Sequence, residues 1–368
     1  MGDPVQIRDN GQIARHPSEG STKQDSPRHQ EGPDPNTIEA ESDRDDDGTD
    51  DGDSARGDDA ASSTASLSSS ILAYRSAHGR TFHSERHDAG YFAPNDEQQK
   101  ESMDLSHHYL TLLLDDKLYL SPLPEKIDRV LDVGTGTGIW AIDFADEFPD
   151  VEVIGTDLSP IQPNWVPPNV KFEIDDATKE WTWPDNYVDF IHMRHLIGAI
   201  PDWTELMHQA FRCCTPGGYL EWGEINPTIC SDDATTDSFS AIQEWNELFR
   251  KGSEVAQRGF CEVENDLQLL PAAGFVDVKH VDYKVPIGSW AKDRRLRQVG
   301  EFLRETIEND LEGYTTVLWH DILQWPDHQH QLFLMGMRNF FKDKRIHGYV
   351  RVRYIYGRKP GLSEEGEI

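Results

Sequence analysis

The segment Arg129-Val-Leu-Asp-Val-Gly134-Thr-Gly-Thr-Gly138 decides how this chain folds. Its apolar beginning predicts a buried strand, and the apolar residues that follow Gly138 predict a helix. Glycines between a strand and a helix allow a tight turn and let a ligand approach the main chain. The free N–H groups at the start of the helix attract a negative group, which we expect to be a carboxylate of the ligand. The segment therefore predicts a ligand-binding loop.

The acids near this loop indicate the kind of ligand. The next predicted strand, residues 151–156, ends at Asp157, 23 residues after Gly134, where a carboxylate can accept hydrogen bonds from both ribose hydroxyls of a nucleoside. A dinucleotide loop would read G-x-G-x-x-G, but here the third glycine comes one position early and position 139 is Ile. Asp132 stands inside the first strand, close to where a cationic ligand group would lie. These details favour S-adenosylmethionine, whose amino and sulfonium groups are positive, over NAD, whose pyrophosphate is negative.

Composition limits the partners that this chain can have. The 368 residues include 35 Lys and Arg against 67 Asp and Glu, a formal net charge of −32. Such a negative field argues against a nucleic acid or an anionic membrane as the main partner. The four cysteines include no CxxC pair, so we expect no metal site and no disulfide scaffold. No stretch is long and apolar enough to predict a membrane span, and we expect a soluble intracellular protein of the nucleus or cytoplasm.

Charge and aromatic residues are unevenly distributed along the chain. Residues 1–70 carry 17 acids and 6 bases and contain no Phe, Trp or Tyr. Such a segment cannot bury enough apolar surface to offset the entropy of ordering it, so we predict a disordered acidic tail. Two interpretations stay open: a solubilising leader, or an arm that docks regulatory protein partners.

Strands and helices alternate in the middle of the chain. Predicted strands at 170–174, 187–191 and 218–222 and a helical stretch at 202–214 indicate βαβ units with a buried parallel sheet. Beyond residue 225, the pattern predicts helices near 235–250, 262–273, 292–308 and 326–341 and strands near 275–284 and at 349–356.

Several of these stretches resemble the class I S-adenosylmethionine-dependent methyltransferases. Asp175-Asp-Ala177 resembles the family's loop after the third strand, and the resemblance implies that Asp176 and Ala177 hold the adenine. Tyr187-Val-Asp-Phe-Ile-His-Met-Arg194 resembles the fourth-strand motif. Thr215-Pro-Gly-Gly218 resembles the turn before the fifth strand, with Cys214-Thr215 in place of the commoner leucine-lysine.

A narrower resemblance is to the fungal LaeA-like branch of that family. It rests on Ser68-Ser-Ser-Ile-Leu-Ala-Tyr74, Gly79-Arg-Thr-Phe-His83, Pro94-Asn-Asp-Glu97, Leu105-Ser-His-His108, Thr135-Gly-Thr-Gly-Ile-Trp140, Asp157-Leu-Ser-Pro-Ile-Gln-Pro163 and Trp165-Val-Pro-Pro-Asn169. The resemblance implies a methyltransferase linked to fungal secondary metabolism, as a regulator or as a tailoring enzyme, acting on a small molecule or a protein. The alternative is a regulatory subunit that keeps the cofactor fold with little or no catalysis.

Pattern and resemblance together predict an α/β, Rossmann-like, seven-stranded, doubly wound sheet. It should be parallel except for residues 349–356, which should lie next to the strand near 275–284. We expect the disordered tail over 1–70 and an N-terminal helical cap over 71–125 that contributes to the cofactor site. The methyltransferase domain should cover 126–358, with acceptor-side helices at about 225–345. A second tail should cover 359–368.

The expected site residues fall into two groups. The predicted contacts to S-adenosylmethionine are Asp132, Gly134, Gly136, Gly138, Asp157, Leu158, Asp176, Ala177 and His192. His195, just past the fourth strand, is the candidate catalytic base, because imidazole titrates near neutral pH. Glu221 and Glu224 follow in the fifth strand, where they either orient a substrate or are simply solvated.

Overall fold

The computed structural model describes residues 73–84, 90–260 and 266–363. All of these belong to the compact unit Asn36–Ile368. The tail predicted over residues 1–70 lies outside the described residues. Within them, no helix is both long and apolar enough to cross a membrane.

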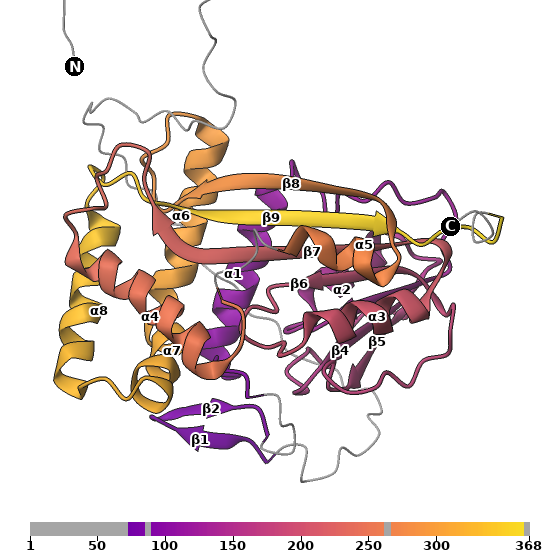
Figure 1. Ribbon diagram of the computed structural model, residues 1–368, viewed down its shortest axis with the longest axis horizontal. Coiled ribbons are helices and arrows are strands. Elements are labelled where there is room, and N and C mark those ends of the chain that lie inside the picture. Colours follow the sequence, from indigo (N-terminus) through magenta and orange to yellow (C-terminus); the bar gives the residue numbers. More distant parts are fainter. Residues whose placement is uncertain (1–72, 85–89, 261–265, 364–368) are drawn as a thin grey trace, which may run out of the picture. The chain divides into compact units, whose positions relative to one another are not determined.

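A seven-stranded sheet forms the centre of the fold, with its strands in the order β5-β4-β3-β6-β7-β9-β8 (Figure 1). The strands are β3 (Arg129–Val133), β4 (Glu152–Asp157), β5 (Val170–Ile174), β6 (Val188–Arg194), β7 (Cys214–Cys230), β8 (Val276–Pro286) and β9 (Tyr349–Arg358). Strands β3 to β7 pair in parallel, whereas β9 is antiparallel to both β7 and β8. This confirms the predicted sheet, including its single reversed strand beside β8.

Helices cover both faces of the parallel part because successive strand residues point to opposite sides. Val130 of β3 packs in one cluster with Trp140 of α2 (Ile139–Glu147). The next residue, Leu131, packs in another cluster with Met207 of α3 (Trp203–Cys213), joined there by α5 (Leu269–Ala273). The sheet is therefore wound on two sides, as the alternation of strands and helices predicts.

The remaining elements gather at the end of the sheet where the parallel strands terminate (Figure 1). Apart from a 3₁₀ turn at Asp266–Gln268, which directly precedes α5 and packs with the α3 cluster, they are the hairpin β1 (Arg75–Ala77) and β2 (Arg80–Phe82), the helices α1 (Glu97–Leu113), α4 (Ser240–Ala256), α6 (Arg294–Asn309), α7 (Leu311–Thr316) and α8 (Asp327–Lys342), and a π-helical turn at Val317–Ile322. The hairpin, α7 and the π-helical turn were not predicted. Together these elements form a second large core beyond the sheet.

The fifth strand of the parallel set differs from the prediction. It begins at Cys214 and includes Thr215–Gly218, where a turn was expected. Its register accounts for the difference: Cys214 pairs with Val188, yet Tyr219 pairs with Phe190, so β7 carries extra residues at this point. Gly217, at φ 85°, takes the left-handed conformation that such a bulge favours. The turn is therefore a bulge inside a longer strand.

Arg80 fastens the hairpin to two helices. Its guanidinium reaches Asp96, the N-cap of α1, and lies 2.6 Å from the fully buried Asp310, the N-cap of α7. Burial raises the pKa of Asp310, and the hydrogen bond and charge of Arg80 oppose that rise. Arg80 thus pairs with the N-cap carboxylates of two helices, and these contacts hold the hairpin over the end of the sheet.

Glu221 of β7 is buried, although the sequence left open a solvated role. Its carboxylate accepts hydrogen bonds from the backbone N–H groups of Leu120 and Ser121 and from the Ser121 hydroxyl, at 2.6–3.0 Å. Glu221 therefore holds the segment that leads into β3, and a solvated side chain was the wrong expectation. Burial raises its pKa from 4.5 to about 7.

This raised pKa predicts a pH-dependent stability. For an acid whose folded pKa is raised, the stabilisation is present below the unfolded value of 4.5 and is lost as the pH rises through about 7. Between about pH 5 and about pH 8, the unfolding free energy of the unmodified protein should therefore fall by about 2 kcal/mol relative to Glu221→Gln. Urea unfolding at both values measures the difference. Glu147→Gln, at an exposed position on α2, is the control. If the difference in unfolding free energy between the unmodified protein and Glu221→Gln is the same at both pH values, the prediction is wrong.

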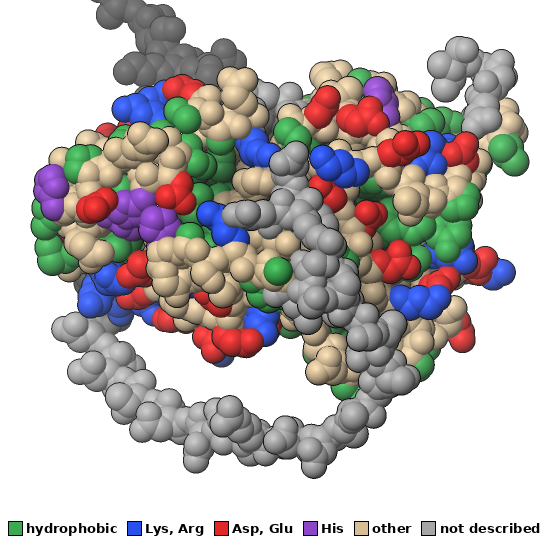
Figure 2. Space-filling view, turned by 90° about the horizontal axis from the view of Figure 1, so that it is seen from below, with side chains coloured by type: hydrophobic (Ala, Val, Ile, Leu, Met, Phe, Trp, Pro, Cys, Tyr) green, Lys and Arg blue, Asp and Glu red, His purple; other side chains and the backbone are tan. Residues whose placement is uncertain are grey.

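Acidic and basic side chains are interspersed over the face seen in Figure 2. Many basic side chains lie against acids, for example Arg353 with Asp282 in the outer strands. The positive charges of the described surface are thus largely offset locally, although the whole chain carries a net charge of −32.

Candidate active site

A cavity of about 230 Å³ lies at the carboxyl ends of β3, β4, β5 and β6. This is where ligands bind in open α/β sheets, because the loops that leave parallel strands diverge there. One part of its wall carries carboxylates, from Asp132, Asp157, Asp175 and Asp176. The other part is mostly apolar and comes from the helices and loops beyond the sheet. The cavity therefore offers two chemically different compartments.

The glycine loop forms the floor of the carboxylate compartment. Gly134, Gly136 and Gly138 have φ angles of 71°, 59° and 80°, which other residues rarely adopt. A side chain at Gly134 would also collide with Leu196, since its Cβ would lie 2.4 Å from Cδ2. All three glycines are thus required by the backbone path, and Gly134 and Gly136 line the cavity directly.

Asp132 and His192 form a buried pair on adjacent strands. The Nδ1 atom of His192 lies 2.6 Å from one carboxylate oxygen of Asp132, and Thr135 donates its hydroxyl to the other oxygen at 2.6 Å. The imidazole stacks on Trp140 with the ring centroids 3.7 Å apart. Burial lowers the pKa of His192, which keeps the ring neutral, although the bond to Asp132 opposes this shift.

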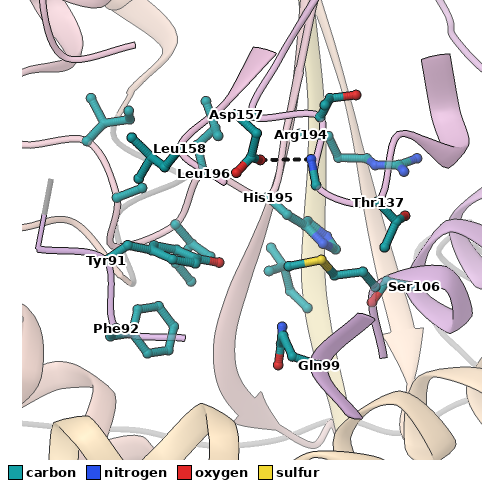
Figure 3. A pocket seen from close by; sticks show the side chains of 18 of the residues that line it. Tyr91, Phe92, Gln99, Ser106, Thr137, Asp157, Leu158, Arg194, His195 and Leu196 are labelled. Atoms are coloured by element: carbon teal, nitrogen blue, oxygen red, sulfur yellow. Dashed lines mark hydrogen bonds between the residues drawn. The ribbon is translucent and has the colours of Figure 1, made fainter. Parts of the chain in front are cut away.

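Asp157 is tied to the glycine loop. One of its oxygens accepts a hydrogen bond from the Gly136 N–H at 2.9 Å (Figure 3), and the other accepts from the Ser159 N–H at 3.2 Å. Burial raises the pKa of Asp157, and the charge of His83 and the backbone bonds oppose that rise. Leu158, the next residue, lines the same wall.

Asp176 and Ala177 line the cavity just after β5. The buried Asp176 uses its Oδ1 atom to accept from the backbone N–H and the hydroxyl of Thr178, at 3.0 and 2.7 Å. Its Oδ2 atom is buried and has no hydrogen-bond partner among the described residues. A buried carboxylate oxygen without a partner is costly, so a ligand donor fits this position.

His195 lies on the cavity wall directly after β6. Its backbone is left-handed at φ 55°, and its N–H donates to the Gly223 carbonyl at 3.0 Å. Burial, together with the positive charge of Arg194, lowers the pKa of His195 to about 3. The ring is therefore neutral and a much weaker base than an ordinary imidazole. Glu224, the other acid that was left open, is buried and accepts from the Leu196 N–H at 2.7 Å, which positions the loop after His195.

Sequence reasoning missed most residues of the apolar compartment. They include Tyr91, Phe92, Gln99, Met103, Leu303 and Tyr314, whereas Trp245 and Phe249, which also line it, are among the aromatic residues that the sequence suggests for an acceptor pocket. One signal was available: α1 places polar residues, Gln99 and Ser102, on the face that the structure buries. Polar residues at core positions of an amphipathic helix indicate a lined cavity or a hydrogen-bond network. Among the described residues, no group of three or more His, Cys, Asp or Glu side chains is arranged to hold a metal ion.

Comparison with known proteins agrees with this fold. Residues 105–279 match the family described as a methyltransferase domain. The methyltransferase pytC of Aspergillus terreus is 35% identical over 327 residues, covering 89% of this chain and 97% of that protein. The secondary metabolism regulator LAE1 of Cochliobolus heterostrophus is 32% identical, over 77% of this chain and 94% of its own. The protein-methionine methyltransferase laeA of Emericella nidulans is 30% identical, over 77% and 75%.

The fold and these matches define a methyltransferase. The chain belongs to the LaeA-like branch of the class I methyltransferases, a class whose methyl donor is S-adenosylmethionine.

Proposed function

We propose that this protein transfers a methyl group from S-adenosylmethionine to an acceptor bound in the apolar compartment, and that the reaction serves secondary metabolism. The observation that carries the proposal is a single cavity in which Asp132, Asp157 and Asp176 stand at the ends of adjacent strands beside an apolar chamber. A cationic and hydrogen-bonding cofactor suits the first part. A weakly polar acceptor suits the second.

The residues present fit the cofactor. Asp132 and the loop of Gly134, Gly136 and Gly138 would face its methionine part, and Asp157 would accept from the ribose hydroxyls. The Oδ2 atom of Asp176, buried without a described partner, would accept from the adenine amino group. Ala177, Leu158 and His192 would complete the contacts around it.

The chain itself contributes alignment and exclusion of water. When bound, S-adenosylmethionine would supply a methyl group to the acceptor's lone pair, and the carbon–sulfur electron pair would stay on the sulfur of a neutral leaving group. An acceptor hydroxyl would release its proton to solvent. Alignment of two bound reactants lowers the barrier chiefly through entropy already lost on binding. The helices beyond the sheet provide the dry wall, and the neutral His195 would contact the acceptor through a hydrogen bond to its Nε2 atom.

The link to secondary metabolism rests on the relatives. Their names include a metabolic regulator, a protein-methionine methyltransferase and a further methyltransferase. A deletion strain profiled for metabolites and transcripts separates a regulator from a tailoring enzyme. Loss of one methyl group from one compound with unchanged cluster transcription defeats the regulator, and a broad fall in cluster transcripts defeats the dedicated tailoring enzyme.

The acidic tail distinguishes enzymatic action from action through protein partners. We propose that residues 1–65 are dispensable for cofactor binding, since the proposed cofactor contacts all lie between Asp132 and His192. In a strain that carries the truncated protein, a purely enzymatic role should survive. Loss of function with cofactor binding intact would favour the docking arm and contradict a purely enzymatic role.

The proposal is tested directly by calorimetry with S-adenosylhomocysteine, the product form of the cofactor. Micromolar or tighter binding at one site per chain is expected. Absence of binding to the purified full-length protein contradicts the proposed function, whatever the acceptor.

Asp176 provides a sharper test of the adenine position. Asp176→Asn keeps an oxygen for Thr178 but replaces the second acceptor with an amide donor, which would face the donor amino group of adenine. We expect a loss of about ten-fold in affinity for S-adenosylhomocysteine. Affinity for S-inosylhomocysteine, which lacks that amino group, should change much less. Equal losses for both ligands would contradict the assignment.

A further inference from the structure

We propose that the acceptor is a neutral, largely apolar ring compound that carries a hydroxyl group, and that Gln99 and His195 hold this hydroxyl. The inference rests on the proposed function and specifies the class of acceptor. Its basis is a pair of buried hydrogen-bonding atoms without described partners, which face a chamber that is otherwise mostly apolar.

Gln99 enters the cavity from the first turn of α1. Its side chain is only 3% exposed and its Oε1 atom has no hydrogen-bond partner among residues 73–84, 90–260 and 266–363. Tyr314 lines the same cavity, and burial raises the pKa of its phenol. Because an amide oxygen only accepts hydrogen bonds, the ligand group that satisfies it must be a donor.

His195 offers the second atom. Its Nε2 is buried and also lacks a partner in the described part of the chain. The ring is neutral, so Nε2 accepts or donates according to the tautomer. Figure 3 shows His195 and Gln99 both reaching into the cavity, with Tyr91 and Phe92 on the opposite side. A non-glycine residue held at positive φ on a cavity wall is typical of functional sites.

The charges of the wall exclude other acceptor classes. The described carboxylates that line the cavity lie within or directly after β3, β4 and β5, in the proposed cofactor compartment. The part of the wall that α4 and α6 supply, with Trp245, Phe249 and Leu303, contains no carboxylate, so an ammonium group bound against it would have no counter-charge there. The one lining Arg or Lys among the described residues, Arg194, lies 3.1 Å from Nδ1 of His107, so its guanidinium already has a hydrogen-bond partner. A neutral hydroxyl group matches the two buried hydrogen-bonding atoms of Gln99 and His195.

The ring preference follows from the shape of the chamber. Tyr91 and Phe92 on one side, with Trp245 and Phe249 from α4, present aromatic surfaces to the cavity. Flat aromatic walls bind flat ligands through offset or edge contacts at little cost in side-chain entropy. A compound of two fused rings is therefore a suitable probe.

The test uses the full-length protein saturated with S-adenosylhomocysteine and five naphthalene probes, measured by calorimetry. The probes are 1-naphthol, 1-fluoronaphthalene, 1-naphthylmethylammonium, 1-naphthoate and 1-(methylthio)naphthalene. We expect 1-naphthol to bind about ten-fold more tightly than 1-fluoronaphthalene, which is the effect of one or two well-placed buried hydrogen bonds. The two charged probes should bind more weakly than the naphthol.

Two variants test whether Gln99 and His195 cause the preference for 1-naphthol. Gln99→Met keeps the length of the side chain and the helix propensity, and His195→Asn uses a residue that tolerates positive φ. In each, the preference for 1-naphthol over 1-fluoronaphthalene should shrink to about three-fold or less, with the affinity for 1-fluoronaphthalene preserved. A merely structural role would lower both affinities together. Gln331→Met, at an exposed position on α8, is the matched control and should keep the full preference.

The outcomes separate this inference from the proposed function. If S-adenosylhomocysteine binds but 1-naphthol shows no preference, or keeps its preference in both variants, the inference fails alone. Tightest binding of an ion or of the thioether probe likewise overturns it, and the thioether result would favour a methionine acceptor. If S-adenosylhomocysteine does not bind, the proposed function fails and this inference fails with it.

Discussion

Replacement of Asp157 with alanine is expected to lower the affinity for S-adenosylhomocysteine about 100-fold or more. The carboxylate ends β4 inside the cavity, and two charge-assisted hydrogen bonds to ribose hydroxyls, at about 1.5–3 kcal/mol each, account for a loss of that size. Asp157 also accepts from Gly136 at 2.9 Å and from Ser159 at 3.2 Å. Its removal would therefore release the glycine loop as well as the ligand. Calorimetry on the purified variant measures the loss.

Two further variants make this prediction specific. Asp157→Asn keeps an oxygen for the Gly136 N–H but loses the charge and one acceptor, so its loss of affinity should be smaller, about ten-fold. Asp143→Ala removes a carboxylate on α2 that lies outside the cavity lining and pairs with His107. It should leave cofactor affinity within about two-fold. Unchanged binding in Asp157→Ala would refute the ribose assignment, and equal losses in all three variants would point to general damage.

The parallel sheet was predictable because each of its elements carries a local signal. β3, β4 and β6 are short apolar runs, and the glycine loop marks where β3 gives way to a helix. The hairpin of β1 and β2 has no comparable signal, since each strand has three residues. Its position depends on Arg80 and Asp310, which are separated by 230 positions in the chain. No local window includes both partners of such a contact.

The site residues also divide into those that local sequence predicts and those that only the tertiary structure shows. Asp132, Asp157 and Asp176 could be singled out because the end of a parallel strand is a fixed place in the fold. Gln99 and Trp245 reach the other compartment from α1 and α4, which only the tertiary structure brings together. The acids of β7 show a further limit of sequence reasoning. Glu221 is buried because backbone donors about 100 positions earlier meet it, so its polarity alone suggested solvent exposure.

Gly138→Ala should destabilise the protein by about 3 kcal/mol, whereas Gly217→Ala should cost only about 1 kcal/mol. The two glycines have similar φ angles, 80° and 85°, so an added methyl group brings left-handed strain to each. Their surroundings differ. A Cβ at Gly138 would lie 2.3 Å from Cζ of Phe172 on β5, whereas nothing lies within 4 Å of a Cβ at Gly217. The difference between the variants therefore isolates the collision with the ring.

Urea unfolding of both variants measures this difference, and a second change identifies its source. Phe172→Leu shortens the side chain that the new methyl group meets, so in its presence the cost of Gly138→Ala should fall toward the cost of Gly217→Ala. The double variant should then unfold closer to Phe172→Leu alone than additivity allows, with a coupling of about 1–2 kcal/mol. Simple additivity would show that Phe172 is not what excludes a side chain at the start of α2. The third glycine of the loop would in that case be required by its backbone conformation alone.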